Sequence, residues 1–589
     1  MEMSSEKIKK DDLTNFQIFI IMGKTISKER TMKLKGARII VECLKREGVD
    51  TIFGYPGGQV IPFFDDFYQY GEGIQLIIPR HEQGGAHAAD GYSRATGKTG
   101  VVIATSGPGA TNTVTGIATA YMDSIPMVII TGQVPCNAIG TDAFQEADIT
   151  GITLPITKAS FLVYHVEELA ETMKMAFYIA RNGRPGPVLV DIPSDIQKSE
   201  GQFHYPEKIE LSKYSPKEHE HPRQIKNVIQ LLANATKPLI LAGGGVIYSD
   251  SAELLNNFAD RYNVPVTHTM MGLGVYPSKE SLYMGGVGMH GAVYANYAVQ
   301  NCDLLIALGV RFSDRIVGSI KTFAPKARIV HVDIDAAEIG KNVRSHYPII
   351  VNVKQFLTEI LSLEAPATDY SAWLEELSLQ KKERPLCYHN DGSLKPQYLL
   401  ELINQYFPQD RIVVTDVGQN QIWSSQFIKV THPRSFLTSG GLGTMGFALP
   451  AAIGAQIGLP GRPVIAIAGD GGFQMNIQEL MTIRRYRLPI KILVLDNTYL
   501  GMVRQWQQLF CDKRYSGTCM QDNPDFAKIA DAIGIHSATI NTVEEAESIM
   551  REFAHYPSAM LVHAHINPEE NVLPMVPSGA SLSHPLTEL

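Results

Sequence analysis

The stretch that decides the fold is Pro463–Asn497, which reads PVIAIAGDGGFQMNIQELMTIRRYRLPIKILVLDN. Two apolar, β-branched runs, Val464–Ala468 and Ile490–Leu495, flank a glycine-rich turn and a segment of helical pattern. This order is typical of a βαβ unit, whose two strands lie parallel in one sheet. Because parallel strands end at the same edge of a sheet, we expect Asp470 and Asn497 to lie close together there.

These two side chains predict a site for a hard divalent cation. Asp470 follows the first strand within Ala-Gly-Asp-Gly-Gly, and Asn497 follows the second strand. A carboxylate and an amide oxygen, without His or Cys, suit Mg2+, which completes its shell with phosphate oxygens and water. Gly469, Gly471 and Gly472 let the backbone approach an anion at the start of the next helix. A lone Gly-Asp-Gly would be a weak signal, because the Asp can simply cap a structural turn.

A similar unit occurs earlier, at residues 101–132, which read VVIATSGPGATNTVTGIATAYMDSIPMVIITG. It again runs strand, Gly-x-Gly turn, helix, Pro and strand, although two unrelated βαβ units would also look alike. The units differ where the first strand ends, at Ser106 in the earlier one and Asp470 in the later one. The sequence therefore predicts two domains of one kind, of which only the later is equipped for a metal.

Length and composition narrow the class of protein. The 589 residues suffice for three to four domains. With 44% hydrophobic and 19% charged residues, the chain can bury large cores and is not a disordered chain. A net charge of −8 argues against nucleic-acid partners, and no apolar run approaches the ~18–20 residues of a membrane span. Six cysteines without C-x-x-C spacing exclude a zinc ribbon or disulfide scaffold and indicate a cytoplasmic protein.

The chain alternates Val/Ile-rich runs with helical stretches, so we expect an α/β protein of three doubly wound parallel-sheet domains. The N-terminal residues carry mixed charge before a short apolar run and fit neither a signal nor a transit peptide. The expected divisions are a disordered extension at 1–32, domains at 33–198, 223–363 and 397–575, linkers at 199–222 and 364–396 (the second with a short helix near Trp373), and a C-terminal tail at 576–589.

The Gly-Asp-Gly at 469–471 followed by Asp-Asn at 496–497 resembles the thiamine diphosphate motif of the pyruvate oxidase and decarboxylase superfamily. The family motif ends in two Asn, so Asp496 is a departure. The resemblance covers almost all of residues 33–575 and implies that Tyr499 adds a backbone carbonyl to the metal ligands. It also implies that the cofactor bridges two domains of different subunits, and hence a homodimer or a dimer of dimers.

Glu82 is the predicted catalytic residue. It follows the strand-like run QLIIPR, where a carboxylate by itself is commonly solvated or caps a helix. In the superfamily that the chain resembles, a Glu of the metal-free domain contacts N1′ of the aminopyrimidine and promotes loss of the thiazolium C2 proton. Acid–base help of this kind is typically worth ~10²–10⁴ in rate. The resemblance also makes Met445 the residue that keeps the cofactor bent, although a Met is more often core filling.

Further motifs resemble the catalytic subunits of acetohydroxyacid synthases. They are Phe53–Gly58, Phe144–Asp148, Arg184–Pro187, Gly288–Gly291, Arg311–Arg315 and Gly501–Trp506. The resemblance implies condensation of two 2-keto acids with loss of CO2, the first common step of branched-chain amino acid biosynthesis. Pyruvate would give 2-acetolactate, and pyruvate with 2-ketobutyrate would give 2-aceto-2-hydroxybutyrate. It further implies a regulatory small subunit as partner.

The resemblance assigns residues to two cofactors and the substrates. For thiamine diphosphate they are Pro56, Glu82, Gln145, Val417, Gly418, Gln419, Asn420, Gly443, Met445, Gly469, Gly471, Gly472 and Met502. For FAD they are Arg184, Gly243, Gly244, Gly245, Gly288, Met289, His290, Gly309, Arg311, Asp314, Arg315, Asp333, Ile334 and Asp416. For the keto acids they are Gly57, Phe144, Gln145, Arg315, Met502 and Trp506.

The flavin is structural in that family. Without the resemblance, the glycines after Leu239–Ala242 are a weak dinucleotide signal, because the full Gly-x-Gly-x-x-Gly is absent. Trp506 matches the residue that favours the larger acceptor, although alone it can also be core packing. Arg315 is the expected fork for the acceptor carboxylate, although alone it reads equally as a surface ion pair.

Three departures from the family pattern leave turnover and pH dependence open: Gly85 for Ala, Ser194 for Lys and Asn420 for His. Ser194 and Asn420 also suggest a catalytically silent cofactor-binding subunit as one alternative, against which the intact Glu82, Asp470 and Asn497 weigh. A flavin-linked pyruvate oxidase is another. A flavin-free catabolic acetolactate synthase is the third, and the Arg311–Arg315 segment disfavours it. A glyoxylate carboligase lacks the Glu.

Overall fold

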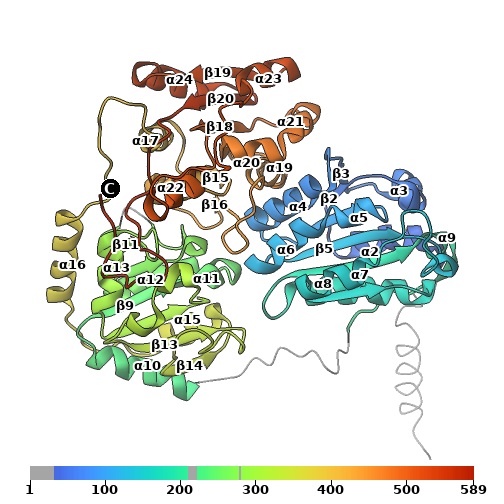
Figure 1. Cartoon of the computed structure of the whole chain (residues 1–589). Coiled ribbons are helices and arrows are strands. Elements are labelled where there is room, and N and C mark those ends of the chain that lie inside the picture. Colours follow the sequence, from blue (N-terminus) through green and yellow to red (C-terminus); the bar gives the residue numbers. More distant parts are fainter. Residues whose placement is uncertain (1–31, 210–221, 278–279, 589) are drawn as a thin grey trace, which may run out of the picture.

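The computed structural model describes residues 32–209, 222–277 and 280–588. Figure 1 shows three α/β domains in chain order, coloured blue, green to yellow, and orange to red. Each contains one six-stranded sheet, and all neighbouring strands in the three sheets run parallel. The predicted fold class is thereby confirmed.

The first domain has its strands in the order β3-β2-β4-β5-β7-β6. They are β2 (Thr51–Gly54), β3 (Gln75–Ile77), β4 (Gly100–Ala104), β5 (Met127–Gln133), β6 (Ala159–Leu162) and β7 (Pro187–Pro193). The helices are α2 (Gly36–Arg46), α3 (Ile61–Tyr70), α4 (Glu82–Thr96), α5 (Pro108–Thr111), α6 (Val114–Asp123), α7 (Ile149–Thr153), α8 (Leu169–Arg181) and α9 (Ser194–Lys198).

Side-chain alternation explains why helices cover both faces of this sheet. On β4, Val101 and Ile103 pack into one core with α2 and α8, whereas Val102 packs into another with α4 and α6. Successive side chains of a strand point to opposite faces, so a strand buried on both sides becomes an unbroken Val/Ile run. That run is the pattern from which the strand was predicted.

The third domain repeats the first strand for strand, in the order β16-β15-β17-β18-β20-β19. Its strands are β15 (Ile412–Thr415), β16 (Phe436–Leu437), β17 (Val464–Gly469), β18 (Lys491–Asp496), β19 (His536–Ile540) and β20 (Met560–His565). Its helices are α17 (Pro396–Tyr406), α18 (Gln419–Phe427), α19 (Ala448–Gly458), α20 (Asp470–Met475), α21 (Leu480–Tyr486), α22 (Gly501–Phe510), α23 (Phe526–Ile533) and α24 (Val543–His555). The internal repeat read from the sequence is therefore real.

The middle domain has a different sheet, ordered β11-β10-β9-β12-β13-β14. The strands are β9 (Pro238–Ala242), β10 (Val266–His268), β11 (Tyr283–Gly286), β12 (Leu304–Leu308), β13 (Arg328–Asp333) and β14 (Tyr347–Ile350). The helices are α10 (Pro222–Asn234), α11 (Gly244–Tyr248), α12 (Ala252–Tyr262), α13 (Val293–Asn301), α14 (Asp314–Val317), α15 (Val353–Ser362) and α16 (Ser371–Glu383). Counted within the domain this is 3-2-1-4-5-6, the order of dinucleotide-binding sheets, whose switch point lies between the first and fourth strands.

The segment expected as a linker at 199–222 begins with regular structure instead. Glu200–Phe203 form β8, which pairs antiparallel with β1 (Met32–Lys35) in a two-stranded sheet. Backbone pairing with a distant strand outweighs the polar composition that suggested a linker. Met32, counted in the N-terminal extension, belongs to β1, while the rest of that extension lies outside the described residues.

The second expected linker and the C-terminal tail both pack on the middle domain. The helix expected near Trp373 is α16, and the buried indole of Trp373 donates from Nε1 to the carbonyl of Pro238 at 3.0 Å. The C-terminal tail lies against the same domain, where the Val576 amide donates to the carbonyl of Met289 at 2.7 Å. One buried aromatic and a few backbone bonds fix segments that look like linkers by composition.

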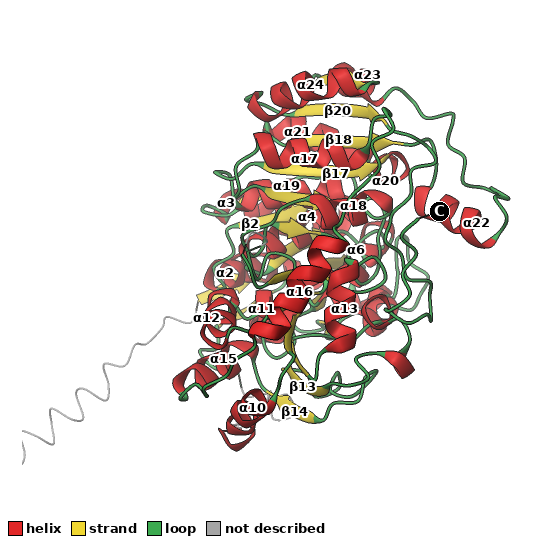
Figure 2. Ribbon diagram, turned by 90° about the vertical axis from the view of Figure 1, so that its left-hand side faces the viewer, coloured by secondary structure: helices red, strands yellow, loops and turns green. Residues whose placement is uncertain are grey.

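The first and third domains join through α4 and α19, which lie side by side in Figures 1 and 2. Glycines allow this approach: a Cβ on Gly91 would collide with the carbonyl of Ala451, and one on Gly454 with the carbonyl of Ala88. Within the described ranges, we find no helix long and apolar enough to cross a bilayer.

Candidate active site

The three predicted metal ligands meet at the carboxyl edge of the third sheet, where they line one small cavity. Asp470 begins α20 directly after β17, and Asn497 follows β18. The Asn497 amide is oriented by its neighbours: Nδ2 donates to Oε1 of Gln419 at 3.0 Å, and Oδ1 accepts from the Tyr499 amide at 3.0 Å. The bond from Nδ2 fixes the orientation of the amide, and because Oδ1 has two lone pairs, the one that does not accept from Tyr499 can bind a cation.

Electrostatics at this edge favour a cation. Burial and the nearby charge of Asp496 raise the pKa of Asp470 to about 7. Burial also acts against the Asp496 carboxylate, but hydrogen bonds from His563, the Thr498 amide and Asn523 outweigh it and hold the pKa of Asp496 below its usual range. Asn523 connects the two acids, donating from Nδ2 to Asp470 at 2.7 Å and to Asp496 at 3.1 Å. A divalent ion at Asp470 would relieve the repulsion that raises its pKa.

The walls of the small cavity suit an anionic group that brings a metal. Predicted cofactor residues that line it are Val417, Gly418, Gln419, Asn420, Met445, Gly469, Gly471 and Gly472. Asn420 Oδ1 is buried here without a hydrogen-bond partner among the described residues, so the wall offers an acceptor that a hydrogen-bond donor or a cation, rather than the anion, can satisfy. The donor set is oxygen only, as Mg2+ requires. These residues therefore fit the diphosphate and metal of thiamine diphosphate.

A larger cavity of about 1310 Å³ lies among the three domains. The predicted flavin residues that line it are Arg184, Gly244, Gly245, Met289, His290, Gly309, Arg311, Asp314, Arg315, Asp333 and Ile334. Gly443, Met502 and Trp506 line it too. Val417, Gly418, Met445, Leu500 and Gly501 line both cavities, which therefore adjoin.

The large cavity fits a dinucleotide. It opens at the switch point of the middle sheet, where Gly244 follows β9 and Gly309 follows β12. Gln426, which lines it, has its Oε1 buried without a partner among the described residues. Asp333 ends β13 at the rim, and burial raises the pKa of its carboxyl to about 6.

Three residues assigned to the flavin, Gly243, Gly288 and Asp416, do not line the large cavity. The two glycines allow close approach of backbone segments, and Asp416 binds backbone amides. A side chain on Gly243 would collide with the carbonyl of Gly309, and one on Gly288 with that of Arg315. Asp416 is buried, which raises its pKa to about 6, and its carboxylate accepts from the amides of Gly446 and Ala448, at 3.0 and 3.1 Å. Asp416 thus fixes the turn after Met445, and the sequence offered no sign of that role.

The remaining predicted residues form a separate group at the carboxyl edge of the first sheet. Pro56, Gly57, Glu82, Phe144 and Gln145 line neither of the two cavities. Glu82 opens α4, and its Oε2 accepts from Nδ2 of Asn112 at 3.0 Å. The Phe144 side chain is 85% exposed. Within one chain, the predicted catalytic carboxylate and the metal ligands therefore line no common cavity among those described.

Glu479 of the third domain supports the turn that presents Glu82. Its Oε1 accepts from the amides of Arg80 and His81, at 2.9 and 3.2 Å, and its Oε2 accepts from the Thr482 hydroxyl at 2.6 Å. The carboxyl group is buried, which raises its pKa. Sequence reasoning missed this residue, because a Glu on a helical run carries no local sign of a partner in another domain.

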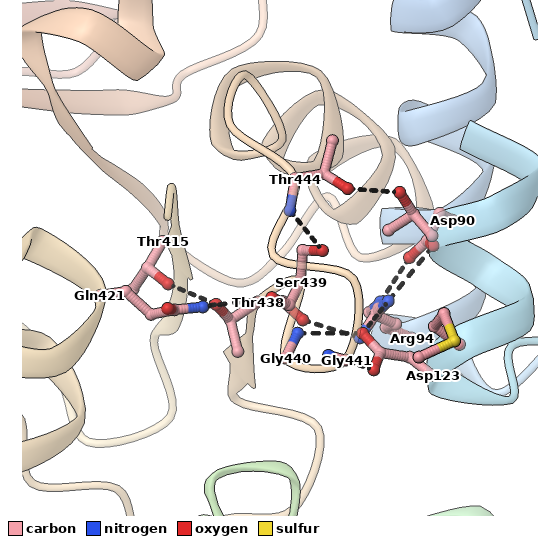
Figure 3. Close-up of polar contacts among 12 residues, drawn as sticks. Asp90, Arg94, Asp123, Thr415, Gln421, Thr438, Ser439, Gly440, Gly441 and Thr444 are labelled. Atoms are coloured by element: carbon pink, nitrogen blue, oxygen red, sulfur yellow. Dashed lines mark hydrogen bonds and ion pairs between the residues drawn. The ribbon is translucent and has the colours of Figure 1, made fainter. Parts of the chain in front are cut away.

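A second junction holds the loop of the third domain that leads to Met445. Figure 3 shows Arg94 and Asp123 beside residues 438–441 of this loop. Arg94 of α4 donates from Nη2 to Asp123 at 2.9 Å and from Nη1 to the carbonyl of Thr438 at 2.8 Å. Asp123 accepts from the amides of Gly440 and Gly441, at 3.0 and 2.8 Å. Buried charges paired in this way fix geometry, so the first domain positions a wall of both cavities.

Comparisons with known proteins accord with this architecture. Three thiamine pyrophosphate enzyme models match in order: the N-terminal TPP binding domain at residues 34–152, the central domain at 225–360 and the C-terminal TPP binding domain at 416–564. The chain is 46% identical over 558 residues to the acetolactate synthase isozyme 2 large subunit of Escherichia coli, covering 94% of this chain and 100% of that protein.

Other relatives give the same picture. The acetolactate synthase large subunit of Haemophilus influenzae is 44% identical over 560 residues, covering 94% of this chain and 98% of that protein. That of Pyropia yezoensis is 45% identical over 569 residues, covering 94% and 95%. The chain therefore belongs to the thiamine pyrophosphate enzymes and, within them, to the family of the acetolactate synthase large subunits.

Proposed function

We propose that the chain condenses two 2-keto acids with loss of CO2. Two pyruvates give 2-acetolactate, and pyruvate with 2-ketobutyrate gives 2-aceto-2-hydroxybutyrate, at the first common step of branched-chain amino acid biosynthesis. The observation that carries the proposal is the oriented oxygen pair of Asp470 and Asn497 beside a cavity lined by Arg315 and Trp506. The names of the relatives support it.

Thiamine diphosphate and Mg2+ are the proposed reactive cofactors. When bound, thiamine diphosphate supplies an acidic carbon that adds to the keto group and takes up the electrons released with CO2. Asp470, Asn497 and the carbonyl of Tyr499 would hold the metal, and Gly471 and Gly472 would let backbone approach the diphosphate. Met445, whose loop Asp416 and Asp123 fix on either side, would form a rigid wall beneath the cofactor.

Glu82 would hold a proton and exchange it with N1′ of the aminopyrimidine. Since it shares no cavity with Asp470 in one chain, we infer a homodimer, or a dimer of such dimers, in which Glu82 of one copy faces the metal site of the other. Phe144 and Leu154, exposed large apolar residues of the same domain, support a covering partner. Glu479 would keep Glu82 in register by holding the preceding turn.

The acceptor keto acid would bind between Arg315 and Trp506. The Arg315 guanidinium is half-exposed, with Nε 3.7 Å from Asp314 and Nη1 3.2 Å from the Met289 sulfur, so its fork can receive a carboxylate. Trp506 and Met502 supply apolar surface for the acceptor chain. Pyruvate and 2-ketobutyrate differ by one methylene, which such a pocket discriminates by only ~1–3 kcal/mol, so we expect both to serve as acceptors.

FAD is the proposed occupant of the large cavity, in a structural role. The strand order of the middle domain and the glycines at its switch point support a dinucleotide. The two rival activities differ on this point, because a pyruvate oxidase reduces its flavin during turnover and a catabolic acetolactate synthase contains none. The name "large subunit" of the relatives supports a small regulatory partner. A cytoplasmic location stays a prediction, which the six unpaired cysteines support.

The test is incubation of the purified protein with pyruvate, thiamine diphosphate, Mg2+ and FAD. We expect 2-acetolactate and CO2 to form. Under anaerobic conditions the visible absorption spectrum should remain that of oxidised flavin throughout turnover. Acetate, or bleaching of the flavin at the rate of turnover, would identify an oxidase. Release of acetaldehyde alone would contradict the proposal.

A further inference from the structure

A second group of possible metal ligands lies at the same sheet edge as Asp470 but outside both cavities. Its members are Asp496, His563 and His565, whose ligand atoms all lie within 4.8 Å of one another. His563 Nε2 is 2.9 Å and His565 Nδ1 is 3.9 Å from the same oxygen, Oδ2 of Asp496. The proposed function uses neither imidazole.

The backbone explains why the three side chains converge. Strands β18 and β20 are parallel neighbours, with Asp496 directly opposite His565. Side chains alternate along a strand, so His563 and His565, two residues apart, point to one face, which is also that of Asp496. All three lie on the last residues of extended strands, where the backbone is fixed by the sheet.

The access and charge of this group suit a cation. Asp496 and His563 are buried, but the His565 side chain is 45% exposed, so an ion and its water can reach the group from solvent. Asp525, which caps α23, lies near enough to act electrostatically on both imidazoles. Asp470 shares the Asn523 donor with Asp496 and adds a further acid next to this group.

The chemistry of the donors differs from that of the proposed Mg2+ site. Two imidazole nitrogens and one carboxylate oxygen form a set that Zn2+, Co2+ and Ni2+ prefer and Mg2+ does not. An ion roughly 2.0–2.2 Å from each ligand atom separates neighbouring ligands by roughly 3–3.5 Å. The pair at 2.9 Å already meets that requirement, and the exposed ring of His565 has only to move slightly inward.

We propose that Asp496, His563 and His565 bind a divalent transition-metal ion, Zn2+ or Co2+ in chemical class, distinct from the Mg2+ of the active site. The side chain of Asn523 connects the two positions, because its Nδ2 donates to both Asp470 and Asp496. An ion on Asp496 adds positive charge next to Asp470 and competes for the carboxylate that Asn523 binds. Occupancy therefore weakens Mg2+ binding and inhibits the enzyme, a consequence that rests on the proposed function, whereas the site itself does not.

The binding test uses Co2+ as the probe on the full-length protein with Mg2+ in large excess. We expect one equivalent of Co2+ to bind with the visible absorption of a four- or five-coordinate ion carrying nitrogen ligands. His565→Ser should weaken this binding at least tenfold, since removing a ligand costs no less than removing its supporting residue. The matched control is His536→Ser on β19, an exposed His of the same domain that pairs with Glu552 at 2.8 Å, and it should bind Co2+ as the unchanged protein does.

Two outcomes would overturn the site. One is equal Co2+ binding and an equal spectrum in the unchanged protein and His565→Ser. The other is loss of the spectrum in Asp470→Asn with retention in His565→Ser, which would place Co2+ at the magnesium position. For the inhibitory role, Zn2+ should inhibit the unchanged enzyme at concentrations at least tenfold below those needed for His565→Ser. If the protein makes no acetolactate, the Co2+ spectrum still decides whether the site exists.

Discussion

The first and third domains have the same sheet, strand for strand, yet present different chemistry at corresponding places. Ser106 lies two residues after the end of β4, whereas Asp470 directly follows β17, the counterpart of β4. After β3 the chain starts a helix with Glu82, whereas after its counterpart β16 it forms the glycine-rich loop that ends in Met445. One architecture thus provides two edges, of which one carries the proposed metal ligands and the other the proposed catalytic acid.

Under the proposed function, the two edges complement each other across a boundary between chains. In one chain, α4 and α19 pack the domains together through close helix contacts, and Glu82 and Asp470 then line no shared cavity among the described ones. In that proposal, each of the two similar domains supplies one half of a site. The difference teaches that the fold decides where functional side chains appear, while a single residue at a strand end decides what they do.

The largest expected effect comes from the acid of the first domain. Glu82→Gln keeps the size and the hydrogen bond from Asn112 but removes the proton carrier, so acetolactate formation should fall by ~10²–10⁴. Initial rates with saturating pyruvate, thiamine diphosphate and Mg2+ measure this. Glu72→Gln, an exposed Glu before β3, is the matched control and should leave the rate unchanged. Near-normal rates in Glu82→Gln would refute the role assigned to it.

The next largest effect is expected in the third domain, where a substitution should weaken the binding of Mg2+. Asp470→Asn removes the charge of the proposed metal ligand, so Mg2+ affinity should fall by at least ~100-fold, more than the loss typical of a supporting residue. Calorimetric titration of Mg2+ in the presence of thiamine diphosphate measures it. Asp531→Asn on α23 changes an exposed carboxylate of the same domain and should bind Mg2+ normally. Equal affinities in the two variants would place the metal elsewhere.

A smaller effect follows from the pKa of Asp470, which burial and Asp496 raise to about 7. Only the carboxylate binds the cation, so the Mg2+ concentration for half-saturation should rise by about tenfold from pH 8 to pH 6. In Asp496→Asn the neighbouring charge is gone, so the pKa of Asp470 should fall and Mg2+ should stay bound to lower pH. A titration midpoint that does not move in this variant would contradict the coupling between the two acids.

The fold could be predicted from the sequence because strands and strand ends are marked by local patterns of residues. Unbroken apolar runs such as Leu304–Leu308 are buried strands in the structure, and strand ends such as that before Asp470 lie at the expected sheet edge. The same reasoning failed for Glu200–Phe203, since a polar segment can be held by pairing with a distant strand. The helix near Trp373 was expected, but its packing through one buried indole was not. Composition describes a segment, but its partner decides the structure.

Long-range polar contacts were the part of the site that could not be predicted. Asn523 reaches both Asp470 and Asp496 from a loop between α22 and α23, and Glu479 holds the turn before Glu82 from another domain. Asp123 looks like an ordinary helix end in the sequence, yet it accepts two backbone amides of the loop before Met445. Such roles depend on packing of the domains, which no spacing within a segment encodes.

The smallest expected effect concerns the first domain, which has no proposed metal ligand at the position that corresponds to Asp470. Ser106 stands where the third domain has Asp470, and its hydroxyl is buried without a partner among the described residues. Ser106→Ala should therefore change the free energy of unfolding by no more than about 1 kcal/mol, because no hydrogen bond within the chain is lost. Mg2+ affinity should stay the same, in contrast to Asp470→Asn. If Ser106→Ala instead weakened Mg2+ binding, the first domain would contribute to the metal site, and the division of labour between the two copies would have to be abandoned.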